Sequence, residues 1–136
     1  MVAIERVWEA EGPFDGILGY SQGAVMAHLL ASKRSESSAP QWLQSLNFVI
    51  CVDGFPSAAE PTPGLNLWPL QRELDIPSLH ISGEQDTAVP SYHHDRLADC
   101  FRSPVMHKHP KGHMMPQCPA VAGAVSAFLQ NQNLIC

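Results

Sequence analysis

The sequence predicts an α/β fold in which helices cover a parallel β-sheet. Short apolar runs alternate along the chain with longer amphipathic stretches, a pattern typical of crossover connections rather than hairpins. The chain has 136 residues, of which 45% are hydrophobic and 15% charged, so its size and composition suit one globular domain with one core. We therefore expect residues 1–136 to form a single domain.

Four runs are predicted to be strands because each is short, apolar or β-branched and bounded by Gly, Pro, Asp or Asn. They are Asp15–Tyr20, Asn47–Val52, Ser78–Ser82 and Val105–His109. Four amphipathic stretches between and around them are predicted to be helices: Ala3–Ala10, Gln22–Lys33, Tyr92–Phe101 and Pro119–Gln130. The proline-rich segment Gly54–Pro69 is expected to be a long connection that covers a site.

Composition excludes several classes of function. Eight basic residues against thirteen acidic ones give a net charge of −5, so nucleic acid is not an expected partner. The longest apolar runs, such as Phe48–Val52, are far shorter than the roughly 20 residues that span a bilayer, and we expect no membrane span. The acidic first residues do not resemble a secretory signal, so a cytoplasmic location is expected.

The four cysteines are scattered without a C-x-x-C pair, and a domain of this size does not need disulfides. We expect all four, Cys51, Cys100, Cys118 and Cys136, to be reduced thiols. Cys51 lies in an apolar run and is expected to be a small buried hydrophobic residue.

The most informative motif is Gly19-Tyr20-Ser21-Gln22-Gly23, which follows a predicted strand and opens a predicted helix. This is the context of a nucleophile elbow, in which a sharp turn exposes a serine hydroxyl. The positions of Gly19 and Gly23 are expected to require a small residue, because strand and helix nearly touch there. Ser21 lies at a helix N-terminus, and the backbone N–H of Gln22 is the predicted oxyanion donor.

A serine nucleophile needs a histidine base and a carboxylate that orients the base. Asp86 lies in the loop after the third predicted strand and is the predicted acid, while His113 lies in the loop after the fourth and is the predicted base. Because the strands are parallel, these loops are expected to meet at one edge of the sheet. Glu84 and, less favoured, Asp53 are the alternative acids.

The remaining histidines are given structural roles. We expect His28 to be a packing or surface residue of its helix, and His93 and His94 to be solvated. His107 and His109 project to one face of a strand and could bind a metal, but no third ligand stands at a suitable spacing, so strand packing is the default interpretation. No metal or cofactor is predicted.

These motifs resemble the family of serine hydrolases that includes the ovarian-cancer-associated hydrolase and fungal polyketide-releasing thioesterases. The resemblance rests on three segments in order: the run from Gly12 to Ala24, the run from Gly83 to Pro90, and Gly112-His113 with Pro116. It implies an α/β-hydrolase fold and cleavage of carboxylic esters or thioesters, with Ser21, Asp86 and His113 as the triad. The chain departs from the family pattern at Tyr20, Lys111 and Asp53, where Phe, Gly and Ser are usual.

Members of that family carry further strands before the elbow, whereas only 20 residues precede Ser21. The chain is therefore expected to be the C-terminal portion of such a fold, about four strands with flanking helices, and to lack the loop that donates a second oxyanion N–H. Its first strand would then be an exposed edge.

Two functional hypotheses follow. The first is an esterase or thioesterase that acts on a small-molecule ester or thioester, with Met114 and Met115 and the Gly54–Trp68 segment lining the substrate pocket. The second is a non-catalytic fragment that self-associates, or pairs with another protein, through its exposed sheet edge.

Overall fold

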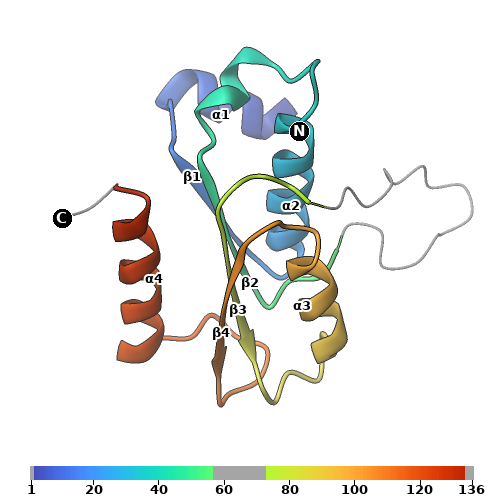
Figure 1. The fold of residues 1–136 in the computed structure, drawn as a ribbon, viewed down its shortest axis with the longest axis vertical. Helices are drawn as coiled ribbons and strands as arrows, with labels where there is room; N and C mark the ends of the chain where they lie inside the picture. Colours follow the sequence, from blue (N-terminus) through green and yellow to red (C-terminus); the bar gives the residue numbers. More distant parts are fainter. Residues whose placement is uncertain (1, 57–72, 134–136) are drawn as a thin grey trace, which may run out of the picture.

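The computed structural model describes residues 2–56 and 73–133. Four parallel strands form one sheet in the order β1-β2-β3-β4, with helices on both of its faces (Figure 1). The expected α/β fold with a parallel sheet is therefore confirmed. Along the chain the elements are α1 (Val2–Glu11), β1 (Gly16–Tyr20), α2 (Gln22–Arg34), the 3₁₀ helix η1 (Gln41–Ser45), β2 (Phe48–Val52), β3 (Ser78–Gly83), α3 (Ser91–Ala98), β4 (Pro104–His109) and α4 (Pro119–Asn131).

The two inner strands are buried and the two outer strands are edges of the sheet. Every residue of β3 is buried, as are four of the five residues of β2. β1 pairs only with β2 among the described residues, in a register that joins Gly16 to Phe48 and Tyr20 to Val52. The predicted position of the first strand at an edge is thus what the structure shows for the described part of the chain.

One face of the sheet is closed by α2, α3, α1 and η1. Its core joins Ala27 and Leu30 of α2 to Val49 and Cys51 of β2 and to Leu97 of α3. At the upper end of Figure 1, α1 and η1 extend this core through side chains that include Trp8, whose indole N–H donates a 2.9 Å hydrogen bond to Ser45. Apolar burial of this extent is the main force that holds these elements on the sheet.

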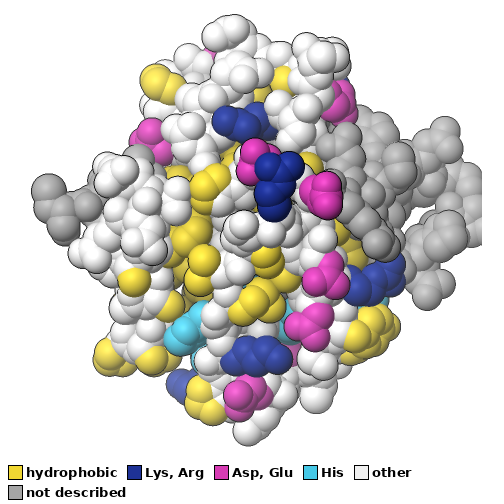
Figure 2. All heavy atoms as spheres, in the orientation of Figure 1, with side chains coloured by type: hydrophobic (Ala, Val, Ile, Leu, Met, Phe, Trp, Pro, Cys, Tyr) yellow, Lys and Arg dark blue, Asp and Glu magenta, His cyan; other side chains and the backbone are white. Residues whose placement is uncertain are grey.

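The opposite face is covered by α4 alone among the described elements. α4 packs mainly on β3 and β4, with Phe128 in edge-to-face contact with Phe48 of β2. The side of this face that lies over β1 is open, and Leu18 is 51% exposed. Figure 2 shows hydrophobic side chains at the surface between α4 and the strands.

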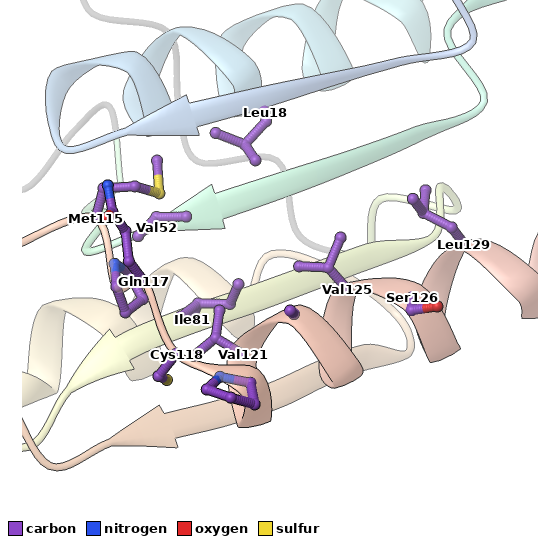
Figure 3. Close-up of a pocket in the computed structure, with 13 residues that line it drawn as sticks. Leu18, Val52, Ile81, Met115, Gln117, Cys118, Val121, Val125, Ser126 and Leu129 are labelled. Carbon is purple, nitrogen blue, oxygen red and sulfur yellow. The ribbon is translucent and has the colours of Figure 1, made fainter.

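A groove of about 740 Å³ follows this open side between α4 and the first three strands (Figure 3). Its walls are apolar: Leu18, Val52 and Ile81 come from the strands, and Val121 and Val125 from α4.

No helix of the described part of the chain is long and apolar enough to cross a membrane.

Most predicted boundaries differ from the structure by a residue, and the largest difference has a physical cause. The helix expected over Tyr92–Phe101 is α3, which ends at Ala98, because Phe101 pairs with Leu74: the N–H of Leu74 donates to the carbonyl of Cys100, and that of Arg102 to the carbonyl of Leu74. The short helix η1 was not predicted at all. Most of the predicted connection Gly54–Pro69 lies outside the described residues.

The cysteine predictions concern buried and half-buried thiols. Cys51 and Cys100 are buried and Cys118 is half-buried, and none of the three forms a disulfide. Burial raises the pKa of the Cys51 thiol to about 12, so this sulfur is inert packing material, as expected. Cys136 lies outside the described residues.

Candidate active site

Ser21 occupies a sharp turn between β1 and α2. Its backbone has φ 53° and ψ −114°, a positive φ that non-glycine residues rarely adopt, and its N–H donates a 2.8 Å hydrogen bond to the carbonyl of Val52. Strained backbone of this kind is typical of functional turns that the surrounding structure holds in place. The turn sets the Ser21 hydroxyl at the N-terminus of α2.

Only one of the two elbow glycines is required by close packing. A Cβ on Gly19 would lie 2.2 Å from the carbonyl oxygen of Gly23, so strand and helix do nearly touch at that position. A Cβ on Gly23 would meet nothing within 4 Å in the described structure. The expectation that Gly23 must be small for the same reason is therefore wrong for the described part of the chain.

The structure brings the predicted nucleophile, base and acid together. His113 Nε2 lies 3.0 Å from Ser21 Oγ, and His113 Nδ1 lies 2.8 Å from Asp86 Oδ2. With its proton on Nδ1, the imidazole donates to the carboxylate and accepts the serine hydroxyl proton. The three residues come from the loops after β1, β3 and β4. These loops lie together, because the strands are parallel and their C-terminal ends are at the same side of the sheet.

Asp86 is held in place as a carboxylate. Its Oδ1 accepts backbone N–H groups from Ala88 at 2.9 Å and Val89 at 2.8 Å, leaving Oδ2 for His113. Burial raises the pKa of Asp86, but the hydrogen bonds from Val89, His113 and Ala88 outweigh it, so the net pKa is lowered. These hydrogen bonds therefore favour the carboxylate form of Asp86.

The two alternative acids have very different surroundings. Glu84 is exposed and is in no side-chain contact with His113 among the described interactions. Asp53, at the end of β2, is fully buried, and its Oδ2 lies 4.0 Å from His113 Nδ1. The sequence favours Glu84 over Asp53, but of these two alternatives Asp53 is the one that lies near His113.

His94 was expected to be solvated, and this is wrong. It is only 4% exposed, and its Nε2 lies 3.5 Å from Asp86 Oδ2. Burial lowers the pKa of His94, while the charges of Asp86 and Asp53 oppose that effect. The available signal was its spacing, because His94, Leu97 and Ala98 form the i, i+3, i+4 pattern of the buried face of α3.

The other predicted site residues lie near the same edge. Gln22 is the first residue of α2, where backbone N–H groups have no partner within the helix. Met114 and Met115 are 38% and 39% exposed; Met115 lines the groove beside α4 and Met114 does not. Of the predicted pocket segment Gly54–Trp68, only residues 54–56 belong to the described chain.

The histidine pair on β4 contains no metal site in the described structure. His109 is buried and its Nδ1 accepts the N–H of Lys111 at 3.3 Å, whereas His107 is half-buried. Among the described residues the ligand-type atoms that do cluster, within 4.8 Å, belong to Asp53, Asp86 and His94. Because the carboxylate oxygens of both aspartates already accept hydrogen bonds, we assign this cluster to the hydrogen-bonded network around His113.

Solved structures share the fold of this chain. Est1E from Butyrivibrio proteoclasticus superposes with a TM-score of 0.67 at 15% identity, covering 98% of this chain and 67% of that one. Acyl-protein thioesterase 2 from Zea mays gives a TM-score of 0.64 at 19% identity, covering 96% of this chain and 62% of that one. At these identities the likeness extends to the α/β-hydrolase fold only.

Sequence relatives are nearer. Esterase C25G4.2 of Caenorhabditis elegans is 32% identical over 133 residues, which is 97% of this chain and 58% of the relative. Esterase OVCA2 of Homo sapiens is 35% identical over 118 residues, 87% of this chain and 50% of the relative. The chain thus spans about half the length of the curated relatives it matches.

A family match covers most of the chain, including Ser21, Asp86 and His113. Residues 1–124 match the family described as Serine hydrolase (FSH1). This agrees with the resemblance that the three sequence motifs indicate. By this match and by the identity with named esterases, the chain belongs to the FSH1 family of serine hydrolases.

Proposed function

We propose that this chain carries the catalytic triad of a serine hydrolase that cleaves small carboxylic esters or thioesters. The observation that carries the proposal is the unbroken line of contacts from Ser21 Oγ through His113 to Asp86, with separations of 3.0 and 2.8 Å. The separations lie within the hydrogen-bond range that proton transfer requires. The elbow geometry of Ser21 supports the same assignment.

The proposed reaction has two halves. Ser21 Oγ attacks the acyl carbonyl while its proton passes to His113 Nε2, and Asp86 stabilises the imidazolium that forms. The N–H of Gln22 donates to the oxyanion of the tetrahedral intermediate, which collapses as His113 protonates the departing alcohol or thiol. Water then attacks the acyl-serine, His113 takes a proton from the water and returns it to Ser21 Oγ, and the carboxylic acid leaves.

The expected setting of this chemistry is the cytoplasm. Cys51 and Cys100 are buried and neither forms a disulfide, which suits a reducing compartment. The proposed reaction uses no metal or organic cofactor, because nucleophile, base and acid are all supplied by side chains. Residues 1–136 are proposed to act as one hydrolase domain.

The decisive test is covalent labelling of the purified 136-residue protein with a fluorophosphonate probe, which forms a phosphonate ester with an activated serine. We expect labelling of the native protein and none of Ser21→Ala, His113→Gln or heat-denatured protein. Equal labelling of native protein and Ser21→Ala would contradict the proposal. Hydrolysis of matched oxygen esters and thioesters of the same acyl group would then separate esterase from thioesterase activity.

A second candidate function is protein–protein pairing through the edge of the sheet. The observation that favours it is β1, which has a neighbour strand on one side only among the described residues and carries the 51% exposed Leu18. Light scattering after size exclusion would then reveal self-association that Leu18→Lys weakens. A monomer at all concentrations would contradict self-association.

A further inference from the structure

A second carboxylate lies beside the proposed base. Asp53 follows β2 directly, is 0% exposed and has a positive φ of 46°. Ser21, at the C-terminal end of β1, also has a positive φ. A charged side chain that is fully buried is costly unless it is hydrogen-bonded and near opposite charge. The buried carboxylate of Asp53 is therefore expected to have hydrogen-bond donors around it.

The two oxygens of Asp53 connect two loops. Oδ1 accepts the N–H of Gly83 at 2.9 Å, where β3 ends and the loop that carries Asp86 begins. Oδ2 accepts the N–H of Met114 at 2.9 Å, immediately after His113. The side chain of Asp53, which follows β2, thus connects the loop that carries Asp86 to the loop that carries His113.

Close packing leaves these loops little freedom. A Cβ on Gly83 would lie 2.4 Å from the carbonyl oxygen of Lys111 and 2.5 Å from that of Gly112, so the end of β3 touches the base loop directly. The N–H of Gln85 also donates to the carbonyl of Lys111 at 3.1 Å. The hydrogen bonds of Asp53 thus add to the backbone contacts that already hold the acid loop against the base loop.

The charge of Asp53 also reaches the imidazole. Its Oδ2 is 4.0 Å from His113 Nδ1, against 2.8 Å for Asp86 Oδ2. An opposite charge at 4 to 6 Å favours a protonated imidazole. The groups that face His113 in the described structure are Asp86, Asp53, Ser21 and the ring of Tyr20, with His94 behind Asp86.

We propose that Asp53 is a positioning residue of this site: it ties the base loop to the acid loop and adds a second negative charge that stabilises protonated His113. The role rests on the proposed function, in which His113 becomes protonated during acyl transfer. Asp86 remains the direct hydrogen-bond partner of Nδ1, and Asp53 acts from 4.0 Å away and through the N–H of Met114.

The first test measures charge without needing activity. The ring signals of His113, assigned by their loss in His113→Gln, are titrated by NMR in the native protein, Asp53→Asn and Asp53→Ser. Removal of the charge is expected to move the titration midpoint to lower pH by about half a unit or more. Glu84→Gln is the matched control, because it removes an exposed carboxylate from the acid loop and is expected to leave the midpoint in place.

The second test measures positioning. Asp53→Asn places an amide NH₂ against one of the two N–H donors, so either the acid loop or the base loop loses its tether, and the rate of fluorophosphonate labelling is expected to fall on the order of 10-fold. Asp53→Ser keeps a single short acceptor and serves as a smaller alternative. For a measurable ester, we expect the loss in kcat and little change in KM.

The outcomes separate this role from the proposed function. An unchanged His113 midpoint in folded Asp53→Asn and Asp53→Ser would overturn the charge role. A shifted midpoint in a protein that never labels would support it and contradict the proposed function. If both variants fail to fold, Met114→Pro decides, because proline lacks the backbone N–H that Asp53 Oδ2 accepts. A folded Met114→Pro protein that labels at the native rate would overturn the proposal.

Discussion

The two faces of the sheet differ in how their apolar side chains are covered. Towards α2 and α3 the face is closed, and residues such as Leu30, Val49 and Leu97 are at most 1% exposed. Towards α4 the face is covered over β3 and β4 and open over β1, where Leu18 is 51% exposed (Figures 1 and 3). The covered parts of the sheet contribute buried apolar area to the stability of the domain, whereas the open part over β1 exposes apolar surface.

The proposed site lies across this boundary. Asp53 and Asp86 follow the inner strands β2 and β3 and accept backbone hydrogen bonds, and His113 follows β4, the outer strand that α4 covers. Ser21 follows the open strand β1 and is tied to the inner sheet by its N–H bond to Val52. The loops of the proposed acid and base are held through the buried carboxylate of Asp53, whereas Ser21 is held through the pairing of β1 with β2.

The largest expected effect is in the closed core. Leu30→Ala removes a fully buried side chain and is expected to lower the free energy of unfolding by about 2–5 kcal/mol, measured as a lower urea midpoint. The matched control is Leu18→Ala on the open strand, where the expected loss is within about 0.5 kcal/mol. Equal losses would mean that the open face is covered in solution, for example by a second copy.

The next effect comes from acid acting on the same core. His28 on α2 is 1% exposed, and burial lowers its pKa from 6.5 to about 4. Protonation therefore favours the unfolded chain, and stability should fall as the pH drops from 6.5 towards 4, by about 3 kcal/mol at pH 4 from this group. Well above pH 6.5, where His28 is neutral in both the folded and the unfolded chain, this group should contribute no slope.

Urea midpoints at several pH values check this effect. His28→Leu removes one titrating group and should reduce the slope between pH 6.5 and 4. His80, whose pKa burial lowers to about 3, acts in the same direction and remains in the variant. Asp86 acts at lower pH, because its lowered pKa gives stability that is present above 3.8 and lost below it. A slope unchanged by His28→Leu would contradict the assignment to His28.

A smaller effect is expected at the elbow, on the open side. Gly19→Ala brings a Cβ within 2.2 Å of the carbonyl oxygen of Gly23 and is expected to cost about 1–3 kcal/mol of unfolding free energy. Gly23→Ala is the control, since its Cβ would meet nothing within 4 Å and alanine favours a helix by about 1 kcal/mol. Equal costs for Gly23→Ala and Gly19→Ala would contradict the assignment of close packing to Gly19 alone.

Local patterns were enough to predict the sheet and the three loops. Each strand is an apolar run with clear boundaries, and parallel strands necessarily place Ser21, Asp86 and His113 at the same edge. Their hydrogen-bond distances add geometry to that arrangement. The start of α2 was equally clear, because a Gly-rich turn precedes an amphipathic helix.

The surroundings of the base could not be predicted in the same way. Asp53 is near His113 only because the base loop folds back over the end of β2, a contact across 61 positions that no local pattern contains. His94 is buried because α3 turns it towards Asp86, whereas the adjacent polar residues suggest a solvated helix start. The position of Asp53, a departure from the family pattern at a strand end, was the available hint.

The smallest expected effect tests the contact between the open strand and the base loop. The ring of Tyr20 on β1 lies 5.2 Å from the ring of His113, with a tilt of 38°. Tyr20→Phe keeps this contact and should change the unfolding free energy by less than about 0.5 kcal/mol. Tyr20→Ala removes it and should cost about 0.5–1.5 kcal/mol beyond the lost apolar area. Equal urea midpoints for the two variants would mean that the open strand is held to the site by its hydrogen bonds to β2 and not by this ring contact.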